Sequence, residues 1–213
     1  MILLSILIFF FCIYYDKLLG IFFNKKNSRN FVAATHAYFS VILHSTCMVI
    51  DFNCFNHNLS HSILNFAYCF SAGYFLFDFY YIVKYERLNI LRGMFLYHHF
   101  ATIYLLLNNQ LYDNTSQLIL LAEISNLPSY IIYYYLHEEN YSKNNSKSNI
   151  IINFTKIVQK VLYTFIRLFL NTIILINMIY KLDFDNLNLL ILSGIIFPVY
   201  IMGILWTTVL VLN

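Results

Sequence analysis

Long apolar runs recur along the whole chain and constrain its fold more than any other feature. An apolar run of about 18 residues can cross the hydrocarbon core of a bilayer as a helix. Seven runs are candidates: Ile2–Phe23, Phe31–Ile50, Ser62–Val83, Met94–Leu111, Gln117–Leu136, Ile151–Tyr180 and Leu187–Leu212. They predict an all-α, polytopic membrane bundle of seven helices, or of six if the first run, which Asp16 and Lys17 interrupt, does not span.

The composition disfavours several other classes of protein. Hydrophobic residues make up 60% of the 213 residues and charged residues 11%, against roughly 45–50% and 25% in soluble domains. A soluble domain of this size could not bury so much apolar side chain. A soluble enzyme, a nucleic-acid-binding protein and a disordered chain are therefore all disfavoured.

Basic residues alternate between loops, and this alternation predicts the orientation of the chain. Loops rich in Lys and Arg face the cytosol. The segments after the first, third and fifth runs are basic, whereas Asp51–His61 and Asn108–Ser116 contain no Lys or Arg. The basic residues are Lys17, Lys25, Lys26, Arg29, Lys84, Arg87, Arg92, Lys143, Lys147, Lys156 and Lys160. We expect an N-terminus outside the cell or in a lumen, and a cytosolic C-terminus.

The first run resembles a signal anchor more than a cleaved signal peptide. It has no basic segment before it and no small-residue cleavage site before Asp16. We predict an N-terminal anchor helix over residues 1–27 and a main transmembrane domain over residues 28–213. The four cysteines have no CxxC spacing, and His57 and His61 fall in a predicted outer loop, so no metal site is predicted.

Ionisable residues inside the predicted spans are the main candidates for a functional site. Each costs roughly 2.5–3.5 kcal/mol at the middle of a spanning helix. Counted from the flanking basic residues at about 1.5 Å per residue, most of them lie roughly 10 Å inside the cytosolic boundary, with Glu123 and Asn126 somewhat deeper. The ionisable residues are His36, His44, Asp78, His98, His99, Glu123 and Arg167.

Most of these residues also belong to polar stripes at helical spacing. Polar faces in a membrane bundle turn away from lipid, so the stripes predict a polar cavity that is accessible from the cytosol. The stripes are Ser71, Tyr74, Asp78, Tyr81 and Tyr85; Glu123, Asn126, Tyr130, Tyr134 and His137; Lys160, Tyr163, Arg167 and Asn171; and His36, Ser40, His44 and Cys47.

The adjacent pair His98 and His99 fits several kinds of chemistry. An imidazole can take a proton or an acyl group while a carboxylate such as Asp78 or Glu123 fixes its tautomer. The same groups could bind a metal ion, or they could form an inert polar core. The His-box pattern of membrane desaturases is incomplete, because Phe95 stands where a histidine is needed.

Several segments resemble the TLC-domain family, which includes ceramide synthases and the translocating-chain-associated membrane protein. Ser71–Asp78 resembles the family's SxGYxxxD helix, and His98–Thr102 resembles its HHxAT core. The residues from Glu123 to Asn126 fall where the family signature has DxSD. Arg29 with His36, and Arg167, fit weaker patterns of an early and a late helix. The resemblance spans about residues 28–212.

The chain departs from ceramide synthases at the acidic motif. Glu123 and Asn126 replace two aspartates, and Ala122 replaces a histidine. Asn126 cannot act as an anionic base. The segment LLAEIS and the proline that follows it are closer to uncharacterised transmembrane proteins of the family than to the synthases.

The resemblance implies work on lipids at the endoplasmic reticulum or a related endomembrane. One hypothesis is an acyl-CoA-dependent acyltransferase with acyl-CoA as co-substrate. Its catalytic residues would be His98, His99, Asp78 and Glu123. Its lipid- or headgroup-binding residues would be His36, Arg167, Arg29, Asn126 and Tyr74.

Two alternatives remain open at this point. In the first, a non-catalytic protein uses the same cavity to bind lipids, either to regulate membrane composition or in trafficking. In the second, the chain is a seven-helix receptor or transporter. Short loops and the lack of internal repeats make the second alternative the weakest.

Overall fold

The computed structural model describes residues 1–52, 57–87, 89–108, 115–137, 146–180 and 187–212, and within these residues the chain forms helices and no strand. The elements are α1 (Ile2–Leu19), α2 (Lys25–Phe52), α3 (His57–Tyr85), α4 (Ile90–Leu107), α5 (Thr115–His137), α6 (Ser146–Leu162), η2 (Tyr163–Leu170), α7 (Asn171–Tyr180) and α8 (Leu187–Leu212). α6, the π-helical segment η2 and α7 follow one another without a break and form one long rod.

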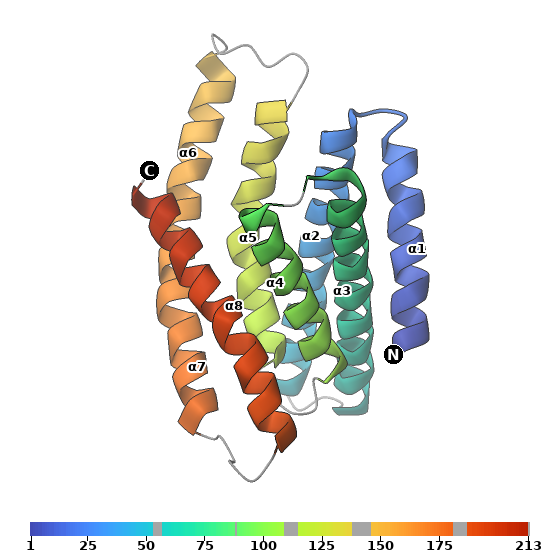
Figure 1. Ribbon diagram of the computed structural model, residues 1–213, viewed down its shortest axis with the longest axis vertical. Helices are drawn as coiled ribbons and strands as arrows, with labels where there is room; N and C mark the ends of the chain where they lie inside the picture. The colour runs from blue at the N-terminus through green and yellow to red at the C-terminus, as the bar shows by residue number, and fades with distance from the viewer. Residues whose placement is uncertain (53–56, 88, 109–114, 138–145, 181–186, 213) are drawn as a thin grey trace.

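Successive rods run in opposite directions through one bundle, and the two termini lie at opposite ends (Figure 1). This is the arrangement expected of a chain that crosses a bilayer an odd number of times. Each of the seven apolar runs of the sequence corresponds to one rod. The predicted all-α polytopic bundle is confirmed, and the protein is an integral membrane protein.

Five helical segments are long and apolar enough to cross a membrane by themselves. They are Ile2–Leu19, Lys25–Ile50, Ser60–Tyr85, Ile90–Leu107 and Ser193–Val211. The helix α5 and the α6–η2–α7 rod are not among them. In α5, polar residues such as Glu123 and Asn126 lower the hydropathy. In the rod, the change to π-helix at Tyr163 divides the apolar run into shorter helices. Glu123, Asn126 and Arg167 line the interior of the bundle.

One predicted loop is shorter than expected. The apolar-run criterion leaves residues 51–61 as an outer loop, but α3 already begins at His57. His57 and His61 therefore lie in the first turns of a helix, where His61 is exposed. The criterion fails here because the polar first turns of a spanning helix extend beyond the hydrocarbon core.

The helix α1 packs closely against α3, and a glycine makes this possible. A Cβ atom on Gly73 would lie 2.7 Å from Ile8 Cβ and from the carbonyl oxygen of Ser5. Any larger residue at this position would push the two helices apart. Ile8 and Cys12 of α1 belong to the same buried cluster as Phe77 and Tyr81 of α3.

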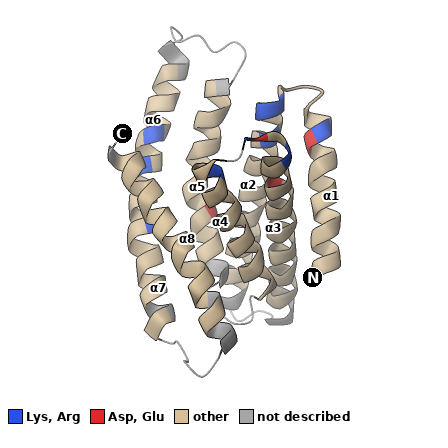
Figure 2. Ribbon diagram, in the orientation of Figure 1, with Lys and Arg blue, Asp and Glu red and all other residues tan. Residues whose placement is uncertain are grey.

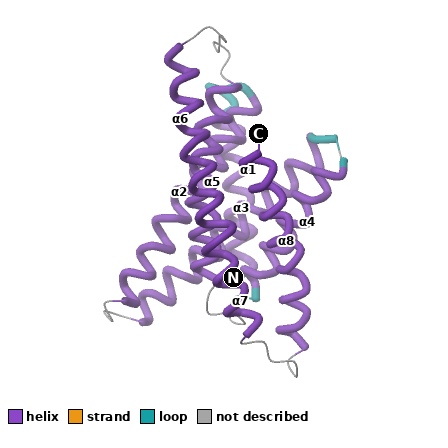
Figure 3. The backbone as a smooth tube through the Cα atoms, turned by 90° about the vertical axis from the view of Figure 1, so that its left-hand side faces the viewer, coloured by secondary structure: helices purple, strands orange, loops and turns teal. Residues whose placement is uncertain are grey.

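Charged residues are concentrated toward one end of the bundle (Figure 2). Lys and Arg of the described residues gather at the upper ends of α1 to α4 and along α6 and η2. We call the upper end, which also contains the C-terminus, the basic end. Figure 3 shows that α6 extends beyond the other helices there. The positive-inside rule assigns this end to the cytosol, and that orientation stays a prediction.

Candidate functional site

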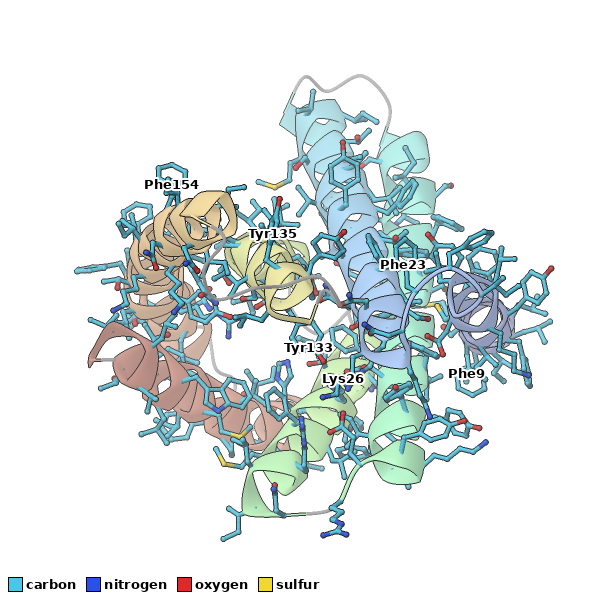
Figure 4. All side chains as sticks on the ribbon, turned by 90° about the horizontal axis from the view of Figure 1, so that it is seen from above. Phe9, Phe23, Lys26, Tyr133, Tyr135 and Phe154 are labelled. Carbon is cyan, nitrogen blue, oxygen red and sulfur yellow. The ribbon has the colours of Figure 1, made fainter. Side chains whose placement is uncertain are left out.

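A cavity of about 600 Å³ lies inside the bundle, with walls from α2, α3, α4, α5, the α6–η2–α7 rod and α8. Figure 4 looks down on it from the basic end, where Lys26 and Tyr133 lie beside the space that these helices surround. Its lining changes in character with depth. Near the basic end it includes Lys26, Arg29, Arg92, Tyr133 and Gln159; in the middle Tyr74, Asp78, His98, His99, Glu123, Asn126, Tyr163 and Arg167; and toward the far end Leu118, Ile119, Leu175, Ile196 and Val199.

Asp78 connects three helices through its carboxylate. Arg29 of α2 donates to Asp78 Oδ1 from Nε at 2.8 Å, and its Nη2 lies 2.7 Å from the same oxygen. His99 of α4 lies with Nε2 2.7 Å from Asp78 Oδ2. A neutral His99 that donates from Nε2 carries its lone pair on Nδ1. This arrangement fixes the tautomer as expected for a carboxylate–histidine pair.

The ion pairs continue from Asp78 toward the basic end. The Nη1 atom of Arg29 also contacts Glu86 Oε1, and Arg92 Nε lies 2.6 Å from Glu86 Oε2. Arg29 is therefore shared between two carboxylates. Arg29 thus links Asp78, in the middle of the cavity, to Glu86 toward the basic end.

The two adjacent histidines of α4 have different surroundings. His99 is hydrogen-bonded to Asp78. His98 contacts the rings of Phe75 and Trp206, with centroid distances of 6.3 and 6.0 Å. The buried Nδ1 atom of His98 has no hydrogen-bond partner among the described residues. Both side chains line the cavity. The ring of His98 is oriented by packing, and its Nδ1 atom is left for a ligand.

Glu123 reaches the cavity from α5, where the charge of Arg167 and the side chain of Asn126 offset part of the cost of its burial. It is 4% exposed, and its Oε2 atom has no hydrogen-bond partner in the described part of the chain. The nearest ionisable contact is His36 Nδ1, 3.9 Å from Oε1, which is beyond hydrogen-bond range. A buried carboxyl oxygen without a partner is rare in a native structure, and it marks a position where a ligand could donate a hydrogen bond.

Arg167 carries a positive charge into the middle of the bundle, and its side chain donates hydrogen bonds to neutral groups. Its Nε donates to Ser125 Oγ at 3.0 Å, and its Nη2 donates to Asn126 Oδ1 at 2.8 Å. Tyr163 also donates to Asn126 Oδ1, at 2.9 Å, and the guanidinium carbon of Arg167 lies 4.4 Å from the ring centroid of Tyr163. Arg167 thus contrasts with Arg29, which pairs with carboxylates.

Tyr163 and Arg167 both belong to η2, the eight-residue π-helical segment. π-helical turns are rare and are often found at functional sites, because the wider turn changes which side chains share a face. The predicted stripe on this rod assumed α-helical spacing. Nothing in the residue pattern predicts the π segment.

A second group of polar residues lies between α2 and α3, and we call it the polar seam: His36, Ser40, His44 and Cys47 of α2 with Ser60, Ser71 and Tyr74 of α3. All are buried. His36 Nε2 lies 3.2 Å from Ser71 Oγ, and the His36 ring stacks on Tyr74 with centroids 3.9 Å apart. His36 is absent from the cavity lining, so two predicted stripes meet each other there rather than a ligand space.

The described residues contain no group of three His, Cys, Asp or Glu side chains close enough to hold a metal ion. Cys12, Cys47 and Cys69 are buried thiols. Cys54 lies outside the described residues. Metal binding by the His98–His99 pair would need a ligand set that this part of the chain does not assemble.

The sequence-based search missed several cavity residues. Arg92 and Lys26 were used only as markers of the boundary, although both line the cavity. Tyr200, Gly203 and Trp206 of α8 also line it, but α8 is mostly apolar and carries no acidic, basic or histidine residue that would mark it as part of a site. A glycine on one face of a spanning helix is the only sign that the sequence offers.

The comparison with protein families agrees with the membrane bundle that the structure shows. The sequence matches the TLC domain over residues 26–213, from the start of α2 to the end of the chain. Neither the curated proteins nor the solved structures include a significant match. Because the matched region covers far more than half of the sequence, this chain belongs to the TLC-domain family.

Proposed function

We propose that the cavity binds a lipid and that the protein acts in membrane lipid homeostasis. Membership of the TLC-domain family indicates a membrane lipid-related function. The observation that carries the proposal is the graded lining of the cavity, which is cationic at the basic end, polar in the middle and apolar at the far end. An amphiphile with a polar or anionic head and an acyl chain has the same gradient. The volume of about 600 Å³ is typical of ligand sites.

Arg167 and Glu123 supply the polar recognition in this proposal. The hydrogen bonds of Arg167 go to neutral groups, which leaves its charge suited to an anionic group of the lipid. Glu123 Oε2 can accept a hydrogen bond from a hydroxyl or an amine of the same ligand. Asn126 joins the two by fixing the guanidinium of Arg167.

Filling the cavity tests lipid binding directly. A Cβ atom on Gly203 meets no atom within 4 Å, and Gly203 lines the cavity. We expect Gly203→Phe to fold and to lose the lipid that copurifies with the wild type, as measured by native mass spectrometry. Gly93→Phe is the matched control, because Gly93 also has open space around it but does not line the cavity. Equal lipid retention in all three proteins would refute the proposal.

A second candidate function is acyl transfer from acyl-CoA to an amine, and His98 is the observation that favours it. An imidazole nitrogen of His98 would attack the thioester carbonyl, so that a C–N bond forms and the C–S bond breaks. The CoA thiolate leaves with the imidazole proton. An amine then attacks the acyl carbon and the bond to His98 breaks. The amine proton is taken up by His99 Nδ1 and passed on to the released His98 nitrogen, which regains the proton that left with the CoA thiol. His99 is suited to accept it, because Asp78 holds the opposite nitrogen.

Mass spectrometry separates the enzyme from the lipid-binding protein. The full chain in nanodiscs is incubated with a long-chain acyl-CoA and digested. The enzyme hypothesis expects an acyl adduct on the peptide containing His98, absent from His98→Ala and longer-lived in His99→Ala. Lipid retention without any adduct in the wild type would leave a non-catalytic lipid-binding regulator.

For the enzyme and for the lipid-binding regulator alike, we propose that the protein lies in an endomembrane such as the endoplasmic reticulum. The basic end faces the cytosol, and residues 1–27 form the anchor.

A further inference from the structure

A second space lies beside the cavity, between α7 and α8. Its volume is about 330 Å³, and its apolar walls come from Leu175 and Ile179 of α7 and from Gly194, Ile196, Phe197 and Pro198 of α8. We call it the lateral groove. It lies in the half of the bundle away from the C-terminus, where α7 and α8 approach their connecting loop (Figure 1).

The lateral groove opens onto the surface that faces the hydrocarbon of the bilayer. Ile179 and Phe197 beside it are 53% and 49% exposed. The α8 wall falls within Ser193–Val211, one of the segments apolar enough to span. Among the described residues no charged side chain lines the groove, and Ser193 is its one polar residue. Around a spanning helix the surrounding medium is lipid, so acyl chains are the groups that meet these walls.

Leu175 and Ile196 line the lateral groove and the cavity alike. The two spaces are therefore neighbours, and aliphatic side chains separate them at this point. Such side chains change rotamer quickly compared with backbone motions. A rotation of Leu175 and Ile196 joins the groove to the apolar end of the cavity.

The backbone of α8 is weakened at the same place. Pro198 has no N–H, so the carbonyl of Gly194, four residues earlier, receives no helical hydrogen bond from it. The neighbouring carbonyl of Ile195 accepts a hydrogen bond from Tyr97 of α4 at 3.1 Å. A Cβ atom added at Gly194 would meet no atom within 4 Å. Open space and a missing backbone hydrogen bond both allow the helix to adjust there.

We propose that the lateral groove is a port through which the acyl chain of a bilayer lipid passes, between Leu175 and Ile196, into the apolar end of the cavity. This inference rests on the proposed lipid binding. The polar part of the lipid is then held in the middle of the cavity, near Arg167 and Glu123. The port explains how an amphiphile reaches its site without drawing its acyl chain through the cationic lining at the basic end.

Photo-crosslinking tests the port. The full chain is placed in nanodiscs that contain a phosphatidylcholine with a diazirine at the end of one acyl chain, and adducts are mapped after brief illumination at increasing times. In the wild type we expect adducts on the peptides of both the groove and the cavity. In Gly194→Phe we expect the groove adducts to disappear and the cavity adducts to form about tenfold more slowly, a change of about 1.4 kcal/mol in barrier height. Gly194→Leu should give a smaller effect in the same direction, and Gly93→Phe none.

The outcomes distinguish the port from the binding site. Cavity adducts that form in Gly194→Phe at the wild-type rate would overturn the port while leaving lipid binding intact. An absence of cavity adducts in the wild type would overturn both. If a second copy of the chain occupies the groove, Gly194→Phe lowers the fraction of dimer in native mass spectrometry without slowing lipid labelling. That result also refutes the port. The thermal unfolding midpoint of each variant confirms that it is folded.

Discussion

Between α2 and α3, His36 bonds to Ser71 and stacks on Tyr74. Its own side chain does not line the cavity, whereas its neighbours Tyr74 and Glu123 do. Across the cavity, His98 and Glu123 have buried polar atoms without hydrogen-bond partners in the described part of the chain. Both regions place histidines inside spanning helices. Only one of them directs its spare polar atoms toward a space that could hold a ligand.

This difference separates two uses of polar residues in a membrane. A polar group inside a bilayer is costly unless it is paired. The polar seam meets most of that cost with contacts of its own, and His36 Nδ1 is its one ring nitrogen beside Glu123 that has no hydrogen-bond partner in the described part of the chain. Its residues therefore stabilise the packing of α2 on α3. The cavity leaves part of the cost unmet, and a bound lipid would offset it. We therefore expect seam variants to lose stability and cavity variants to lose ligand.

The largest effect is expected where α2 and α3 share an ion pair. Arg29→Ala removes the partner of Asp78 and Glu86 and leaves two partly buried carboxylates without it. Removing one member of a buried pair costs about 3 kcal/mol or more. Titration of the unfolding transition with dodecyl sulfate in mixed micelles would measure this loss. Arg87→Ala is the control, because Arg87 is exposed and its loss should change stability by less than about 0.5 kcal/mol. Equal effects of the two variants would contradict the ion-pair account.

A smaller loss is expected inside the polar seam. His36→Ala deletes a ring that is 1% exposed and stacked on Tyr74. The cavity left behind and the lost hydrogen bond should lower the free energy of unfolding by about 2 kcal/mol. Lipid retention should stay at the wild-type level. Loss of the bound lipid with unchanged stability would instead support the headgroup-binding role that the sequence predicts for His36.

Ser71→Ala sharpens the same point with a smaller change. It removes the hydroxyl that lies 3.2 Å from His36 Nε2 and 3.5 Å from Ser40 Oγ. We expect a loss of about 1 kcal/mol. In a double-mutant cycle with His36→Ala, the two losses should be less than additive by about 0.5 kcal/mol or more. Strict additivity would show that the two side chains do not interact.

A loss of stability no larger than that of Ser71→Ala is expected at His98. His98→Ala removes ring contacts with Phe75 and Trp206 but no hydrogen bond at Nδ1. Its free energy of unfolding should fall by only about 1 kcal/mol, because the site already borders open space. The acyl adduct expected of the enzyme should disappear. A loss as large as that of Arg29→Ala would show that His98 is a packing residue.

The sequence predicted the bundle well, because hydropathy depends on runs of residues that the structure keeps as rods. It also predicted which ionisable residues lie inside the bundle. It could not predict which polar stripes contact one another and which face the cavity. Ser71 and Tyr74 share a face with Asp78, yet Ser71 packs into the seam, Asp78 faces the cavity and Tyr74 contacts both.

Two further features lay outside the reach of periodicity. The π-helical turn around Arg167 depends on tertiary packing, and α-helical spacing describes it poorly. The contribution of α8 comes from Gly203 and Trp206, which look like ordinary lipid-facing residues in an apolar helix.

One side-by-side measurement tests the central claim most directly. Arg167→Met and His36→Ala are compared with the wild type for retained lipid and for the free energy of unfolding in the same micelles. The account predicts a crossover: Arg167→Met loses about tenfold in lipid affinity, or about 1.4 kcal/mol, with little change in stability, and His36→Ala loses stability while it keeps its lipid. The same ranking of the two variants in both measurements would contradict the separation of seam from cavity.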